Sequence, residues 1–265
     1  MFLFEYPGLL FFVICIVLLL SYEIGFRLRA RNHDKIGQDG DKQIEETRNQ
    51  IAVLLSLLIG FTLSMALTRF DYRKQLVVDE ANAIGTTYLR AMMQPEPVRT
   101  QASGLLRNYV DTRMAMFGDA TTEPQREASA RQSKQIQNQL WAGAVTTSQR
   151  SPTPITSIYV QALNEMIDLD GKRVAAAANR IPPDIWFLLG ILSIMTTIVV
   201  GYGQRQRAAL TTFVPVLTIA IALSLIADLD SPTHGLIRVD QQSLQSLSVD
   251  FKTGMPTTEH QLPDQ

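Results

Sequence analysis

The sequence predicts an all-α, multi-pass membrane protein with four transmembrane helices, arranged as two, a polar helical insertion, and two more. Four apolar stretches contain no Asp, Glu, Lys, Arg or His. Because an α-helix rises ~1.5 Å per residue and a hydrocarbon core is ~30 Å thick, each stretch has about the length needed to cross a bilayer. Residues 69–184, between the second and third stretches, are polar. No run in the chain alternates apolar and polar residues with the period of a strand.

The first transmembrane helix is predicted within residues 1–24. Its apolar part extends from Tyr6 to Tyr22, and Glu23 can reach the membrane interface by snorkelling. We expect a retained anchor rather than a signal peptide, because no basic region precedes the apolar run and no small-residue cleavage site follows it. Cys15, the only cysteine, lies in this helix. An intramolecular disulfide is therefore impossible, and a packing role is expected.

A short basic loop is predicted over residues 25–48, before the second transmembrane helix at residues 49–68. Two glycines, Gly37 and Gly40, are typical of a loop. Six bases lie in this segment: Arg27, Arg29, Arg31, Lys35, Lys42 and Arg48.

Residues 69–184 are predicted to form a polar helical bundle domain. Apolar residues recur at helical spacing, as in Val77, Ala81 and Ile84, and again from Leu106 to Val110. Further helices are expected at residues 124–141 and 155–181, and the prolines at 95, 97, 152 and 154 mark the breaks. The first and last helices of the bundle are expected to continue directly into spans two and three.

The third and fourth transmembrane helices are predicted at residues 185–204 and 208–227. Pro182, Pro183 and Asp184 form a good helix start, because proline tolerates the first turn and a carboxylate favours the N-terminus. The connection is so short that the two spans should form an antiparallel hairpin. Residues 228–265 are predicted to be an acidic, partly disordered tail, with disorder from Val249 to Gln265.

Four crossings place both termini and the 69–184 domain on one side of the cell membrane, but two arguments disagree on which side. The two short loops hold eight bases, whereas the tail holds six acids and two bases, so the positive-inside rule puts the loops in the cytoplasm. Against this, six further bases lie close to the membrane on the other side: Arg69, Arg73, Lys74, Lys172, Arg173 and Arg180. The orientation stays open.

Span two carries a stripe of small residues, one every four positions, where another helix can approach closely. One interpretation is packing against span one or span three of the same chain. The other places the stripe at a subunit interface or around a pore. The candidate pore or helix-packing residues are Ser56, Gly60, Phe61, Thr62 and Ser64, with Ala52 beginning the stripe.

A basic collar follows span two and consists of Arg69, Arg73 and Lys74. Its simplest interpretation is a set of snorkelling cations with i,i+4 partners on a solvated helix. A second interpretation is a cationic pore mouth that concentrates anions.

Several classes of function are disfavoured. The net charge of −1 gives no field to attract nucleic acid. Spans two to four contain no ionisable side chain, which argues against a proton-coupled transporter but not against a passive channel gated by an apolar constriction. His33, His234 and His260 lie in three separate segments, and no phosphate loop, nucleophile elbow or zinc motif occurs. We therefore expect no enzyme activity and no cofactor.

Two groups of residues resemble a known family. Gly60-Phe61, then Ala66, then the run from Arg69 to Lys74, resembles the segment that follows the neck of bestrophin channels. The stretches Glu80–Thr86 (EANAIGT) and Asp228–Gly235 (DLDSPTHG) are similar to a bacterial bestrophin-like domain family of membrane proteins, a domain of unknown function. That resemblance extends over essentially the full chain.

The resemblance implies a homo-oligomer in the inner membrane, a pentamer in bestrophins, with span two around the axis. It also implies an acidic calcium site after the last span, where Asp228 and Asp230 stand here. The alternative for these two acids is a helix stop, because Ca²⁺ normally takes 6–8 oxygen ligands. The bestrophin plan puts the large domain in the cytosol, contrary to the loop charges.

The resulting hypothesis is an oligomeric, bestrophin-like passive channel in the lipid bilayer for small anions such as chloride, with helix two lining the pore. The alternative is a membrane-anchored sensor or scaffold whose helical domain binds a ligand or a protein partner.

Overall fold

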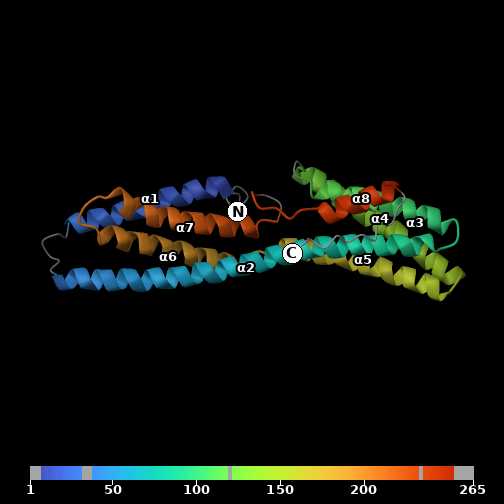
Figure 1. Ribbon diagram of the computed structural model, residues 1–265, viewed down its shortest axis with the longest axis horizontal. Helices are drawn as coiled ribbons and strands as arrows, with labels where there is room; N and C mark the ends of the chain where they lie inside the picture. The colour runs from blue at the N-terminus through green and yellow to red at the C-terminus, as the bar shows by residue number, and fades with distance from the viewer. Residues whose placement is uncertain (1–6, 32–37, 119–120, 233–234, 254–265) are drawn as a thin grey trace, which may run out of the picture. The chain divides into compact units, whose positions relative to one another are not determined.

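The computed structural model describes residues 7–31, 38–118, 121–232 and 235–253. These residues form α-helices and no strand, so the predicted all-α class is confirmed. The helices (Figure 1) are α1 (Pro7–Arg31), α2 (Gln38–Met92), α3 (Val98–Met116), α4 (Glu123–Arg150), α5 (Pro154–Ala178), α6 (Pro183–Tyr202), α7 (Ala209–Asp230) and α8 (Gln242–Thr253).

The chain divides into two compact units, and α2 contributes to both. The span unit comprises residues 1–71 and 179–238, and the helical domain comprises residues 72–178 and 239–265. Four helical segments in the described residues are long and apolar enough to cross a membrane. They are α1, α2, the stretch 154–202 that contains α6, and α7. The prediction of four candidate spans is confirmed.

Two glycines allow α1 and α6 to approach closely in the span unit. A Cβ atom on Gly25 would overlap the backbone carbonyl of Ile198, and one on Gly201 would overlap that of Tyr22. Only hydrogen fits at both positions, as is common where membrane helices pack backbone to backbone. Beside this contact, α7 packs on α1 (Figure 1). A core of Leu18 and other buried aliphatic residues forms between the helices.

The segment predicted as a loop over residues 25–48 is mostly helical in the structure. α1 continues to Arg31 and α2 already begins at Gln38, so only residues 32–37 lie outside the described helices. The polar ends of the helices are held by ion pairs. Asp41 lies 2.5 Å from Arg29 and 2.5 Å from Arg205, and i,i+4 pairing joins Glu23 to Arg27 at 2.7 Å.

The bundle helices are not all where the sequence placed them. α4 extends past residue 141 to Arg150 because its polar surface carries no signal to stop, and a capping box of Thr122 and Gln125 begins it. α5 ends at Ala178, and α6 begins at Pro183. The predicted direct continuation into span three is therefore wrong, since the ring of Pro183 blocks an uninterrupted helix. The predicted continuation of span two into the bundle is confirmed by α2.

The helical domain has one main core. The predicted apolar faces are buried: Val77, Ala81 and Ile84 on α2, and Leu106, Tyr109 and Val110 on α3. α3 packs on α4, and α4 packs on α5.

Helix α8 completes this core and corrects the prediction of disorder from Val249. It includes residues 249–253, while residues 254–265 lie outside the described residues. Leu244 and Phe251 are buried, and the ring of Phe251 stacks on Tyr88 with 4.2 Å between centroids. Figure 1 shows α8 beside α3. The apolar residues of α8 recur at helical spacing, and docking on the core stabilises a helix too short to be stable alone.

A buried carboxylate joins the helices of the domain. Glu80 of α2 is inaccessible to solvent and pairs with Arg113 of α3 at 2.8 Å and with Arg173 of α5. Arg113 also lies 2.6 Å from Asp170. Burial alone would lower the pKa of Arg113, but the negative charge of Glu80 raises it overall. The four groups form a neutral buried network.

The Phe117 ring covers this network on one side. The guanidinium carbon of Arg173 lies 4.0 Å from the ring centroid, and that of Arg113 lies 5.3 Å from it. Such cation–π contacts are strengthened by the exclusion of water.

Replacing Glu80 by Gln should destabilise the helical domain by about 3–5 kcal/mol, because two arginines would then be buried with only Asp170 to balance them. Denaturant unfolding of the detergent-solubilised chain measures the change. Glu165 is exposed on α5 and provides the matched control, since Glu165→Gln should change stability by no more than about 0.5 kcal/mol. Equal stability of the two variants would contradict the role given to Glu80.

Candidate functional site

One face of α2 in the span unit is open. Ser56, Gly60 and Ser64 are exposed, and a Cβ added at Gly60 would meet no atom within 4 Å. The neighbouring Phe61 is 63% exposed although it is apolar. In the described residues, no other helix packs against Gly60 itself. The close glycine contact lies instead between α1 and α6.

Thr62 lies on the opposite face of α2 from this surface. Its side chain is buried, and its hydroxyl donates to the carbonyl of Leu58 at 2.7 Å. The hydroxyl of Ser56 likewise donates to the carbonyl of Ala52 at 2.8 Å. Membrane helices often satisfy hydroxyls in this way. The structure therefore separates Thr62 from Ser56, Gly60, Phe61 and Ser64, which remain together on the exposed side.

An apolar groove of about 760 Å³ flanks the exposed face. It is bounded by α2, α6 and α7 and is lined mostly by aliphatic groups, including Ile59 and Val214. Ala52 and Ser56 of the small-residue stripe form part of its wall. The stripe is thus exposed at Gly60 and Ser64 and borders the groove at Ala52 and Ser56.

The three residues of the predicted basic collar have different surroundings. Arg69 lies 3.8 Å from Asp230, and Arg73 is buried. Lys74 is exposed. Two of the three cations are thus directed into the protein, and Lys74 is the collar residue that meets solvent.

Asp228 and Asp230 hold the end of α7 and the segment that follows it. Asp228 accepts hydrogen bonds from the backbone N–H groups of Leu236 and Ile237 at 2.8 and 3.0 Å. Asp230, the last residue of α7, accepts one from the N–H of Ile181 at 3.1 Å. Carboxylates occupied by backbone donors support the helix-stop interpretation. No cluster of three or more potential metal-ligating side chains occurs in the described residues.

The Glu80 network and the glycine pair were not predicted as sites. Arg113 lies on the apolar, buried face of α3. Because an arginine is rarely buried without a partner of opposite charge, its position was the available signal for a buried acid. Small residues precede both glycines at four-residue spacing, Ser21 before Gly25 and Ser193 and Thr197 before Gly201, and this was the signal available for the glycine pair.

The family comparison covers most of the chain. The Bestrophin-like domain matches residues 12–244. The chain therefore belongs to the Bestrophin-like domain family. No curated protein matches it.

Solved structures of a bacterial bestrophin homologue from Klebsiella pneumoniae have the same fold as this bestrophin-like chain. One single-substitution variant has 12% sequence identity and a TM-score of 0.69, with 92% of this chain and 96% of the homologue covered. Another has 14% identity and a TM-score of 0.67, with 93% and 99% covered. At this identity the likeness is one of fold.

Replacing Asp228 by Ala should destabilise the bestrophin-like chain by about 1–3 kcal/mol, because two backbone donors lose their acceptor. Thermal unfolding in detergent should show the same loss in excess Ca²⁺ and in a chelator. If Ca²⁺ stabilised the original chain but not the variant, Asp228 would be a metal ligand and the helix-stop interpretation would be wrong.

Proposed function

We propose that this bestrophin-like chain is one subunit of an oligomeric, passive channel for small anions, with the open face of α2 around the central axis. The observation that carries the proposal is the exposure of Gly60 between Ser56 and Ser64. Small residues on a membrane helix permit close approach of another backbone, and here the chain itself provides none. A second copy of α2 is the partner that fits such a surface.

The composition of the spans favours passive conduction. Residues 49–68 of α2 contain no ionisable side chain, so no group is available to bind and release a proton at membrane depth. An apolar ring formed by Phe61 and its copies would suit a constriction that opens and closes by wetting. Lys74, exposed after the span, would favour anions at one mouth of the conduit.

The oligomer number follows from the bestrophin plan, which is pentameric. A cyclic assembly would place the same surface of every copy toward the axis and would cover apolar groups such as Leu57 and Phe61, which are exposed in a single chain. The lipid bilayer would cover the outward surfaces of the other helices.

Gly60→Leu should abolish assembly or reduce anion flux at least about tenfold, because an isobutyl group would occupy the surface where copies meet. The substitution should leave the fold of one chain intact, because Gly60 is exposed and a Cβ added there meets no atom within 4 Å. Light scattering in mild detergent and chloride efflux from liposomes are the two measurements. Gly190 of α6 is equally open, and Gly190→Leu is the matched control.

A monomeric mass for the original chain, or proteoliposomes that release no chloride, nitrate or bromide, would overturn the proposed channel. Normal flux through the Gly60→Leu variant would show that α2 does not line the conduit, although the protein would still be a channel.

The alternative, a membrane-anchored sensor or scaffold, is favoured by the eight bases in the two short loops, which place the helical domain outside the cytoplasm. We expect the bestrophin orientation instead. Gln132 is exposed on α4, so a Gln132→Cys variant with Cys15→Ser should resist a membrane-impermeant thiol reagent in intact cells and react after lysis. Labelling of intact cells would favour the sensor.

A further inference from the structure

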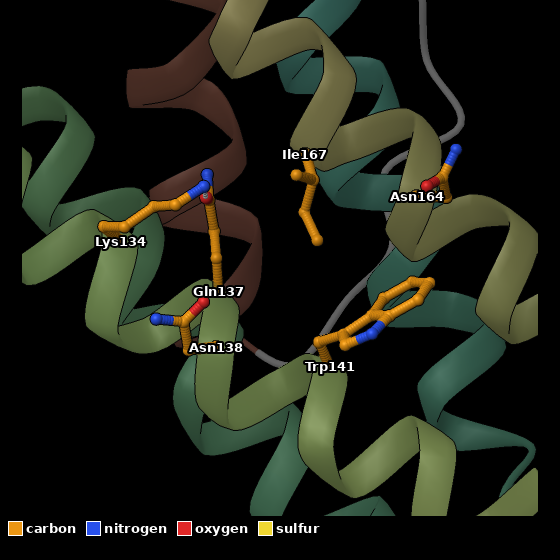
Figure 2. Close-up of a pocket in the computed structure, with 6 residues that line it drawn as sticks. All are labelled: Lys134, Gln137, Asn138, Trp141, Asn164 and Ile167. Carbon is orange, nitrogen blue, oxygen red and sulfur yellow. Dashed lines mark hydrogen bonds between the residues drawn. The ribbon is translucent and has the colours of Figure 1, made fainter.

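A polar cavity lies in the helical domain, apart from the α2 surface. It has a volume of about 200 Å³ and is lined by Lys134, Gln137, Asn138 and Trp141 of α4 and by Asn164 and Ile167 of α5. Figure 2 shows these six side chains around the opening between the two helices. The four α4 residues are spaced i, i+3, i+4 and i+7 and therefore share one face of the helix.

The lining has a cation and no acid. In the described part of the chain, the ammonium of Lys134 has one hydrogen bond, to the amide oxygen of Gln137 at 3.4 Å (Figure 2). Two acids accept hydrogen bonds from lining residues, Asp168 from Asn164 at 3.1 Å and Asp170 from Gln137 at 2.9 Å. The other oxygen of Asp170 lies 2.6 Å from Arg113. Lys134 therefore faces the cavity with only a neutral partner.

The amides and the aromatic ring define the rest of the site. Gln137 is buried, and its amide nitrogen donates to both Asp170 and the hydroxyl of Tyr109, so the orientation of its oxygen toward Lys134 is fixed. Asn138 also lines the cavity, one turn of α4 beyond Lys134. Trp141 and Ile167 supply an apolar wall. The site is a cationic pole with amide side chains nearby, beside a flat apolar surface.

We propose that this cavity binds a small organic monocarboxylate whose carboxylate lies at Lys134 and Asn138 and whose flat body packs on Trp141. The volume is that of about six or seven waters, which suits a compact acid rather than a nucleotide or a peptide. A charge-assisted hydrogen bond to Lys134 provides the selectivity for an anion. The tryptophan ring provides apolar contact area.

The site has a direct connection to the buried ion network. Gln137 links the cavity to Asp170, which pairs with Arg113, which pairs with Glu80 of α2. Occupancy that fixes Lys134 and Gln137 would stabilise this chain of contacts. Ligand binding should therefore raise the unfolding temperature of the helical domain.

Benzoate is the probe for the test, and the full-length chain in detergent is the receptor. Equilibrium dialysis with radiolabelled benzoate should give saturable binding of one molecule per chain. Benzamide and benzylamine, which keep the ring and lose the negative charge, should not displace it. Lys134→Gln should weaken binding by about tenfold or more, as expected for the loss of a charge-assisted hydrogen bond.

Lys172→Gln is the matched control, because Lys172 is an exposed lysine on α5 of the same domain and does not line this cavity. It should leave the affinity unchanged. Trp141→Ala should weaken benzoate more than acetate, which has no ring to stack. Lys134 and Trp141 are both exposed enough for substitution without loss of the fold, and circular dichroism verifies this for each variant.

Absence of saturable benzoate binding, equal competition by benzamide, or an equal loss of affinity in the Lys134→Gln and Lys172→Gln variants would each overturn the proposal. The proposed channel is tested separately by flux and by mass. Failure of either proposal therefore leaves the other standing.

Discussion

The ion network around Glu80 connects α2, α3, α4 and α5 of the helical domain and reaches the residue before α8. The carboxylate of Glu80 pairs with arginines from α3 and α5, and the network continues from Asp170 to Gln137 on α4 and from Arg173 to Gln241 beside α8. Burying a charge without partners is costly, so these side chains must meet together for any of them to be buried. Aliphatic contacts between two helices can be made in several registers, whereas hydrogen-bonded charges are satisfied in one relative position of the helices.

The general architecture was predictable because it depends on properties that are local in sequence. A charge-free run of about 20 residues identifies a span wherever it packs, and apolar residues at helical spacing identify a buried face such as that of Ile84. The polar ends of α1 and α2 have neither signal, since their helices are held by Asp41 reaching Arg29 and the distant Arg205. Helix α8 does carry apolar residues at helical spacing, but it is too short to be stable alone, and its order comes from docking on Tyr88 and the core.

The candidate site was predictable only in part. The spacing of Ser56, Gly60 and Ser64 identified a contact surface, yet whether that surface is filled depends on where α1 and α6 settle, which no local pattern records. The collar prediction treated Arg69 and Arg73 as solvent-facing cations, whereas Asp230 draws Arg69 inward. Lys134 and Trp141 lie on a polar helix with no distinguishing motif. They line a cavity only because Asn164 and Ile167 of α5 lie opposite them in the folded domain.

The place of α8 in the chain affects how the protein is made. The core of the helical domain begins with residues of α2 and is completed by Leu244 and Phe251, which follow both α6 and α7 in the sequence. A ribosome must therefore synthesise α6 and α7 before that core can close. During this interval Tyr88 lacks Phe251, the ring that stacks on it in the folded chain. Closure of this core is accordingly a late step in the synthesis of the chain.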